Sequence, residues 1–308
     1  MARTRVIIDT DPGVDDAVAI LLALASPELD VAAITTVAGN VSLEKTTLNA
    51  RRVLDLAGRP DVTVAAGAAD ALAGPKDRAG DVHGRDGLGD LEWDEPAVAL
   101  DPAPAIEVQR RLIEAGPISI VAIAPLTNLA HLLERHPGID AAVERVVIMG
   151  GASFEGNVTP AAEFNVWSDP EAAERVFAAS WPITLMPLDL THQALLNDGD
   201  LARLRGLGND VGRRVADMLE PYAVFHDRWY GRRVLYMHDA MAVYELIDPD
   251  AITKQGARVT VETGGAHSRG ATWIDRRREY AQGSVKVGVT VNNARFLDLL
   301  CERLATLP

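Results

Sequence analysis

The sequence predicts an α/β protein with a mainly parallel central sheet and helices on both faces. Through the first two-thirds of the chain, short β-branched apolar runs alternate with longer segments of helical periodicity, a pattern typical of such sheets. With 308 residues, of which 48% are apolar and 24% charged, the chain is long enough to cover a sheet on both sides. Because we find no internal repeat and no linker, we expect residues 1–308 to form one domain.

The expected strands of the main sheet are short apolar runs, namely residues 6–8, 31–37, 62–65, 118–123, 145–149 and 183–186. The expected helices are the Ala-rich end of the stretch 6–22, residues 43–57 and 106–115, a helix from Thr127 that stops before Pro137, one that begins at Pro170, most of 198–235, 238–247 and 294–304. Additional short strands are expected near the C-terminus, at residues 258–262, 272–274 and 285–291. Residues 67–95 are rich in Gly and Asp and lack periodicity, so we expect a long loop of the kind that often serves function.

The charge balance limits the possible partners. A net charge of −14 argues against nucleic acid and against an anionic membrane surface, because both require a basic patch. A neutral or cationic small molecule is a better substrate for such a protein than a polyphosphate. The sequence contains no apolar segment of signal or membrane-spanning length, so we expect a cytoplasmic protein. The one cysteine, Cys301, is expected to be a small buried apolar side chain.

Four carboxylates follow the first strand within eight residues: Asp9, Asp11, Asp15 and Asp16. Like charges this close raise one another's pKa unless a cation neutralises them. The dipole of the following helix favours Asp15 and Asp16, which open it, and this alone would explain those two residues. It does not explain Asp9 and Asp11, which lie on the strand side of the turn. Carboxylate oxygens around one point suit a hard cation, Ca²⁺ or Mg²⁺.

Further polar residues follow the later strands at the same edge of the sheet. Asn40 follows the second strand, Thr127 the strand 118–123, and Glu163 and Asn165 lie in the loop after Met149. A single Asn or Thr in a loop is usually a turn former. In an open parallel sheet, however, ligands bind outside the carboxyl ends of the strands, so the recurrence of these residues at one edge predicts a single site.

Residues 9–17 read Asp-Thr-Asp-Pro-Gly-Val-Asp-Asp-Ala, and this run resembles the signature of the inosine–uridine-preferring nucleoside hydrolases. These are calcium-dependent enzymes that cleave the N-glycosidic bond of ribonucleosides. Further segments similar to the family's motifs occur in order along the chain, at residues 38–40, 124–130, 146–151, 156–157, 162–165 and 238–240. The resemblance implies the Rossmann-like fold of that family.

The resemblance also implies roles for individual residues. It places Ca²⁺ on Asp11, Asp16, Thr127 and Asp239, and it places the ribose against six residues: Asp15, Asn40, Met149, Asn157, Glu163 and Asn165. A calcium-bound water is then the nucleophile and Asp11 is its general base. Breaking the bond develops an oxocarbenium-like sugar, so the leaving base also needs assistance, for which we expect His238.

The base pocket is expected to include His83, His226 and Tyr230. His226 and Tyr230 are four residues apart and share one face of a predicted helix, although core packing explains Tyr230 nearly as well. Trp167, Trp181, Trp229 and Trp273 are more typical of core or interface positions than of a stacking platform, and Trp229 is of interest because it adjoins Tyr230. Purine, pyrimidine and nicotinamide-type nucleosides all remain open, with the His and Tyr residues favouring pyrimidines. The family forms homodimers and homotetramers, and we expect the same here.

Two other functions fit parts of the pattern. Asp9-Thr-Asp11 after an apolar strand also resembles the nucleophile pair of the Mg²⁺-dependent phosphatases of the haloacid dehalogenase type. That family needs a later Lys, and this chain has few lysines and a charge that disfavours phosphoesters. A ribose- or metal-binding protein without catalysis is the second alternative, against which the presence of Asp11 and Asp239 speaks.

Overall fold

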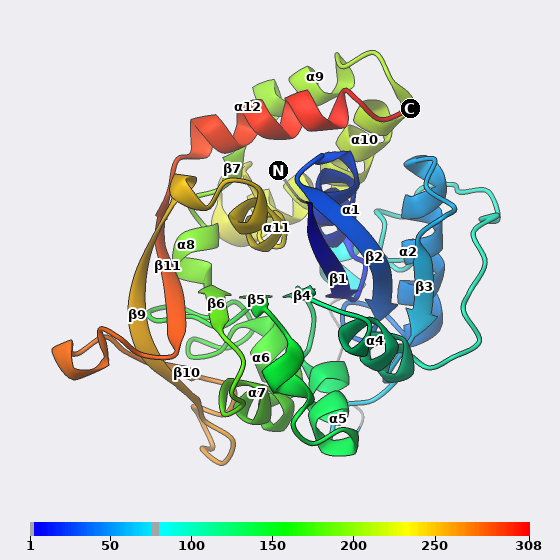
Figure 1. Ribbon diagram of the computed structural model, residues 1–308. Coiled ribbons are helices and arrows are strands. Elements are labelled where there is room, and N and C mark those ends of the chain that lie inside the picture. Colours follow the sequence, from blue (N-terminus) through cyan, green and yellow to red (C-terminus); the bar gives the residue numbers. More distant parts are fainter. Residues whose placement is uncertain (1–2, 75–79) are drawn as a thin grey trace.

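The computed structural model describes residues 3–74 and 80–308, except for the side chains of residues 80, 81 and 230. Within this part of the chain, nine strands form one sheet in the order β10-β9-β11-β6-β5-β4-β1-β2-β3 (Figure 1). Seven of them run parallel, from β3 through to β11, and β9 and β10 add an antiparallel edge. The strands are β1 Thr4–Thr10, β2 Leu29–Thr36, β3 Thr63–Ala66, β4 Ser119–Ala122, β5 Arg145–Met149, β6 Ile183–Met186, β9 Ile252–Val261, β10 Thr272–Asp275 and β11 Val285–Val291.

Helices cover the two faces of this sheet. One apolar cluster joins α1, α2, α9, α10, α11 and α12 to one face, and another joins α4, α5 and α7 to the opposite face. Val6 and Ile8 of β1 belong to the first cluster and Ile7 to the second, because successive side chains of a strand point to opposite faces. The helices are α1 Val14–Ala25, α2 Leu43–Leu56, α3 Gly80–His83, α4 Ala105–Glu114, α5 Thr127–Arg135, α6 Phe164–Ser168, α7 Pro170–Phe177, α8 Leu188–Thr191, α9 Asp198–Arg205, α10 Asp210–Tyr230, α11 Ala240–Ile247 and α12 Asn293–Leu304.

The order of strands β3 to β6 is that of a doubly wound sheet. The chain runs outward from β1 in one direction through β2 and β3 and in the other through β4, β5 and β6. A crevice therefore forms between the carboxyl ends of β1 and β4. This arrangement confirms the predicted fold class, including the additional strands near the C-terminus.

The segments that differ from the prediction depend on contacts between distant residues. The expected helical region 198–235 is divided into α9 and α10 and ends in the short strand β8 Leu235–Tyr236, which pairs with β7 Leu195–Leu196. The loop predicted at 67–95 contains the one-turn helix α3, and residues 75–79 of it lie outside the described residues. No helix in the described part of the chain is both long and apolar enough to cross a membrane.

Candidate active site

A cavity of about 540 Å³ lies at the carboxyl ends of the central strands. It receives side chains from the first turn of α1, from the loops after β2 and β5, from α3, α6 and α10, and from the segment before α11. Ten of the predicted site residues line it: Asp15, Asn40, His83, Met149, Asn157, Glu163, Asn165, His226, His238 and Asp239. Asp11, Asp16 and Thr127 are buried behind the wall rather than in its lining.

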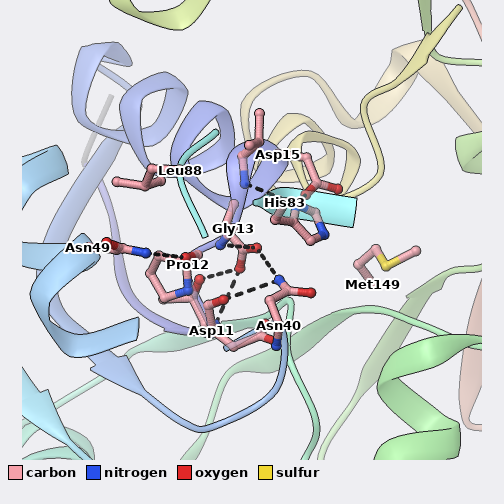
Figure 2. A network of polar contacts seen from close by, with 12 residues as sticks. Asp11, Pro12, Gly13, Asp15, Asn40, Asn49, His83, Leu88 and Met149 are labelled. Atoms are coloured by element: carbon pink, nitrogen blue, oxygen red, sulfur yellow. Dashed lines mark hydrogen bonds and ion pairs between the residues drawn. The ribbon is translucent and has the colours of Figure 1, made fainter. Parts of the chain in front are cut away.

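Asp16 holds the turn between β1 and α1 in shape. Its carboxylate accepts hydrogen bonds from the Thr10 hydroxyl at 2.5 Å, the Gly13 amide at 3.0 Å and the Asn40 side chain at 3.1 Å. The amide of Asp11 also lies 3.3 Å from Asp16 Oδ1. Because an acid in the first turn of a helix accepts amide protons there, the short run between Asp11 and Asp16 is sufficient to form this loop. Figure 2 shows the resulting network.

Asp11 is completely buried, and only one of its carboxylate oxygens has a hydrogen-bond donor among the described residues. Oδ2 accepts the amide proton of Asn40 at 2.6 Å, whereas Oδ1 has no donor in this part of the chain. A Cβ at Gly39 would lie 2.0 Å from Asp11 Oδ2, so glycine is required for the loop after β2 to approach this closely. Burial and the neighbouring charge of Asp16 raise the pKa of Asp11 well above its ordinary value.

Asp15, Asp16 and Asp239 place carboxylate oxygens within 4.8 Å of one another. Burial, together with the charge of Asp16, raises the pKa of Asp15 to about 8. Burial and the charges of Asp15, Asp16 and Asp11 raise the pKa of Asp239 well above its ordinary value. Because the donors that reach Asp11 and Asp16 are neutral groups, these four acids repel one another, and a divalent cation would relieve that repulsion. This cluster could therefore hold a metal ion.

Thr127 begins α5 directly after β4, at the other side of the crevice. Its hydroxyl donates a hydrogen bond to Asp169 Oδ2 at 2.7 Å. Asp169 also accepts from the amides of Leu72 and Ala172 and thereby joins the loop after β3 to the start of α7. The side chain of Thr127 is thus engaged away from the acidic cluster, which leaves its backbone carbonyl as the group that could face a cation.

Glu163 organises the loop on the β5 side of the cavity. Its carboxylate accepts from the amides of Gly151 at 2.8 Å, Asn165 at 2.8 Å and Val166 at 3.2 Å, and it caps α6. Burial raises the pKa of Glu163 to about 7, although these hydrogen bonds oppose the shift. Asn165 donates to the carbonyl of Met149 at 3.2 Å, and Asn157 Oδ1 accepts the amide proton of Phe164 at 2.9 Å.

Three histidines lie on the side of the cavity formed by α3, α10 and β8. A row of rings joins them in the order His83, Tyr222, His226, Tyr236, His238, with neighbouring centroids 4.3–5.7 Å apart. Burial lowers the pKa of His83 to about 3 and that of His226 to about 4, and it lowers the pKa of His238 well below the ordinary value. All three rings are therefore neutral near pH 7.

Hydrogen bonds fix the tautomers of two of these rings. The Nδ1 atom of His83 accepts the amide proton of Val14 at 3.2 Å, so the proton of its neutral ring is on Nε2 (Figure 2). The Nδ1 atom of His226 lies 2.8 Å from the carbonyl of Val234, to which it donates, so the proton of that ring is on Nδ1. The side chain of Tyr230, the fourth residue predicted for this side, lies outside the described part of the chain.

Several cavity residues were not predicted from the sequence. Tyr222 and Phe225 line the cavity from α10, and Phe164 lines it from α6. Tyr222 is four residues before His226, so the helical spacing that links His226 to Tyr230 also identifies it. Trp167 and Trp229 line the cavity, contrary to our expectation of core or interface positions, whereas Trp181 is a core residue as expected.

Comparison with known proteins identifies the family. The family model described as inosine-uridine preferring nucleoside hydrolase matches residues 6–298. The chain is 42% identical, over 98% of both chains, to a protein of Shewanella woodyi named pyrimidine-specific ribonucleoside hydrolase RihA. Among solved structures it resembles the plant nucleoside hydrolase PpNRh1, with a TM-score of 0.93 and 36% identity over 99% of both chains. A purine-preferring ribonucleoside hydrolase from Gardnerella vaginalis gives a TM-score of 0.92 and 31% identity over 98% of both chains. The chain therefore belongs to the inosine-uridine preferring nucleoside hydrolase family and is a ribonucleoside hydrolase, an enzyme that cleaves N-glycosidic bonds.

Proposed function

We propose that this enzyme hydrolyses pyrimidine ribonucleosides to free base and ribose, with a Ca²⁺ ion held by Asp11, Asp16, Thr127 and Asp239. The observation that carries the proposal is the convergence of buried carboxylates, all with raised pKa, at one wall of a cavity of about 540 Å³. The lining of the same cavity also carries amides and a carboxylate suited to sugar hydroxyls, and aromatic and imidazole rings suited to a base.

The donor set fits a calcium ion. Hard oxygen ligands from several carboxylates and a backbone carbonyl are those that Ca²⁺ prefers. The buried Oδ1 of Asp11 has no hydrogen-bond donor among the described residues, and a cation would satisfy it. The hydroxyl of Thr127 is bonded to Asp169, and this contact orients the residue that we assign as the carbonyl ligand.

When bound, Ca²⁺ supplies a common anchor for the two ribose hydroxyls and for a water, whose pKa it lowers. We assign Asp11 as the general base that accepts a proton from the attacking water. The positive charge that develops on the sugar in the transition state lies among buried acids, which stabilise it electrostatically.

Six residues are assigned to the ribose: Asp15, Asn40, Met149, Asn157, Glu163 and Asn165. All six line the cavity, and Glu163 and Asn165 are fixed by their own hydrogen bonds to the loop after β5. A site built to bond hydroxyls strongly rejects analogues that lack them, because its polar groups are then left unpaired. We therefore expect 2′-deoxyuridine to be hydrolysed at least about 10²-fold more slowly than uridine.

The base is assigned to the row of rings. His238 is adjacent to the proposed metal ligand Asp239 and lines the cavity, so it can donate a hydrogen bond to the departing base. His83 and His226 are also assigned to the base pocket. The preference for pyrimidines is supported by the name of the 42%-identical relative, whereas the purine-preferring structure is more distant at 31% identity.

The test is a panel of nucleosides assayed for free ribose, with and without a calcium chelator. We expect uridine and cytidine to be hydrolysed faster than inosine, activity to be lost with the chelator, and calcium to restore it. Full activity in the chelator would reject the metal assignment. Equal rates on inosine and uridine would reject the preference for pyrimidines.

The two alternative functions are not supported. The chain matches the nucleoside hydrolase family over residues 6–298, and the relative and the solved structure compared above are named as nucleoside hydrolases. Of its four lysines, Lys45 bonds the Arg85 carbonyl and Lys254 pairs with Glu245, both away from the cavity. A binding protein without catalysis would release no ribose in the same assay.

A further inference from the structure

Thr191 contacts His238 although the two residues are 47 positions apart. Thr191 ends α8, the short helix that follows β6 at the same edge of the sheet as the cavity. Its side chain is completely buried, and its hydroxyl oxygen lies 2.7 Å from Nδ1 of His238. Thr191 has no role in the proposed function. Its contact is with Nδ1 of His238, which leaves the other ring nitrogen, Nε2, to bind a ligand.

Backbone contacts hold these two residues in register. The strands β7 and β8 pair between Leu195 and Tyr236, and the amide of Met237 donates to the carbonyl of Ala194 at 3.0 Å. The amide of Thr191 donates to the carbonyl of Pro187 at 3.0 Å. The ring of His238 also packs against those of His192 and Tyr236, with centroids 5.6 and 5.7 Å away, which limits its rotation. The hydroxyl–imidazole contact is therefore a built feature of the fold.

The direction of this hydrogen bond follows from the cost of an unsatisfied donor. Among the described residues, His238 Nδ1 is the one hydrogen-bond partner of the Thr191 hydroxyl. A buried hydroxyl proton without an acceptor is unfavourable, so the hydroxyl donates to Nδ1. A neutral imidazole that accepts at Nδ1 carries its proton on Nε2. The ring that lines the cavity then offers a donor to a ligand rather than an acceptor.

We propose that Thr191 is a positioning residue that holds His238 in its Nε2–H tautomer, so that His238 donates a hydrogen bond to the leaving base. This inference rests on the proposed function, in which His238 assists the leaving group. In the opposite tautomer Nε2 would present a lone pair, which would repel the negative charge that develops on the base. Thr191 therefore acts on the reaction through the orientation of one proton, without touching the substrate.

The first test needs no variant. In protein labelled with ¹⁵N-histidine, two-bond ¹H–¹⁵N correlation spectra at neutral pH distinguish the two tautomers, and comparison with His238→Ala assigns the signal. We expect the pattern of a protonated Nε2 and an unprotonated Nδ1 for His238. A protonated Nδ1 at His238 would overturn the inference.

The second test compares Thr191→Val, which removes the hydroxyl at nearly constant volume, with Thr191→Ser, which retains it. The substrates are uridine and p-nitrophenyl riboside, whose leaving group needs no assistance. A hydrogen bond to a group that carries or develops charge changes a rate by about tenfold or more. We therefore expect Thr191→Val to lower kcat on uridine about tenfold. We expect little change in KM, less than about twofold loss on p-nitrophenyl riboside, and recovery on uridine in Thr191→Ser.

A purely structural role for Thr191 gives a different result. If Thr191 had only a structural role, Thr191→Val would lower kcat equally on both substrates. That outcome, or an unchanged kcat on uridine, would overturn the inference. His238→Ala separates this inference from the proposed function on which it rests. Equal losses on both substrates in His238→Ala reject the role of His238 and with it the inference. A selective loss in His238→Ala without one in Thr191→Val rejects the inference alone.

Discussion

Asp11 has the strongest individual case for a chemical role. It is fully buried, yet one of its carboxylate oxygens has no hydrogen-bond donor among the described residues. Asp9, two residues earlier, is just as buried, and its Oδ2 likewise has no donor there, but its Oδ1 accepts from three neutral side chains, those of Thr35, Gln109 and Asn128. Since burial is the same, the difference lies in what surrounds each acid: amides and a hydroxyl around Asp9, and other acids around Asp11. Asp9 therefore joins strand ends, whereas Asp11 is placed to bind a cation and a water.

We predict that Asp11→Asn lowers kcat on uridine about 10²–10⁴-fold, because the amide cannot accept a proton from the attacking water. The rate is measured at calcium concentrations that saturate the variant, so that weaker metal binding does not contribute. Asp9→Asn is the matched control, because it replaces an equally buried acid by the same amide. Asp9→Asn should lower the melting temperature but leave kcat largely unchanged. Equal losses of kcat in the two variants would contradict the assignment of Asp11.

The site residues that could be predicted from the sequence contact residues nearby in the chain, whereas those that could not be predicted contact residues far away in the chain. Asp11, Asp15 and Asp16 interact within one turn, so their clustering is visible in a run of six residues. Thr191 and His238 meet only because β7 pairs with β8, and both strands are two residues long. Two residues carry too little periodicity to be recognised, so this contact could not be predicted from the sequence.

At the scale of elements, α2 connects the acidic turn to the loop that carries His83. Asn49, buried in α2, donates to the carbonyl of Pro12 at 3.0 Å (Figure 2). It also donates to the carbonyl of Asp86 at 2.8 Å. Gly87 has a φ of +91°, and a Cβ there would lie 2.8 Å from Asn49 Nδ2, so the loop passes against the amide where only glycine fits. His83 in turn accepts the amide proton of Val14, so α2, the turn and the loop form one unit.

We predict that Asn49→Ala raises KM for uridine about tenfold, because it leaves two carbonyls without their donor and releases the His83 loop. Hydrogen exchange of the amides of residues 83–90 should accelerate in parallel. Lys45→Ala is the matched control, because Lys45 lies on the same helix and bonds the carbonyl of Arg85 in the same loop, but at the surface. If Lys45→Ala raised KM as much as Asn49→Ala, the hydrogen bonds of Asn49 would not be what holds the His83 loop.

The elements of the doubly wound half were predictable because each strand and helix there has its own periodicity. The strands expected at 145–149 and 183–186 are β5 and β6 with the same bounds. After residue 190 the order of strands no longer follows the outward winding of the first six strands. The last strand, β11, inserts between β6 and β9 and pairs parallel with one and antiparallel with the other. Such pairing is set by the whole tertiary structure, so local patterns could not reveal it.

At the scale of the whole molecule, one sheet carries the two large apolar clusters, which supports our proposal that residues 1–308 fold as a single domain. The buried acids lie at the middle of this sheet, where β1 and β4 diverge. Their mutual repulsion therefore acts on the folded state as a whole, and its relief by a cation should be measurable as stability.

The sign of this effect depends on pH. The folded-state pKa of Asp15 is about 8, against an ordinary value of 3.8, and those of Asp11, Asp16 and Asp239 are also raised. Without a cation the folded state therefore binds more protons than the unfolded chain between about pH 4 and pH 8, and its stability falls as the pH rises through this window. His83 and His226 have lowered pKa values, about 3 and about 4. They make stability rise with pH only up to the ordinary histidine pKa of about 6.5, so they add no pH dependence above that value.

We predict that the increase in melting temperature caused by saturating Ca²⁺ is larger at pH 8 than at pH 6.5. The chelated protein loses stability over this range as Asp15 and its neighbours lose their protons, whereas the loaded protein does not, because the ion compensates their charges. Differential scanning calorimetry with calcium or with chelator at the two pH values measures the difference, in which pH effects common to both forms cancel. Asp239→Asn removes one of the repelling acids and should reduce both the calcium effect and its dependence on pH. An increase in melting temperature that is the same at both pH values would show that the acids do not share a cation, and the proposed calcium site would have to be abandoned.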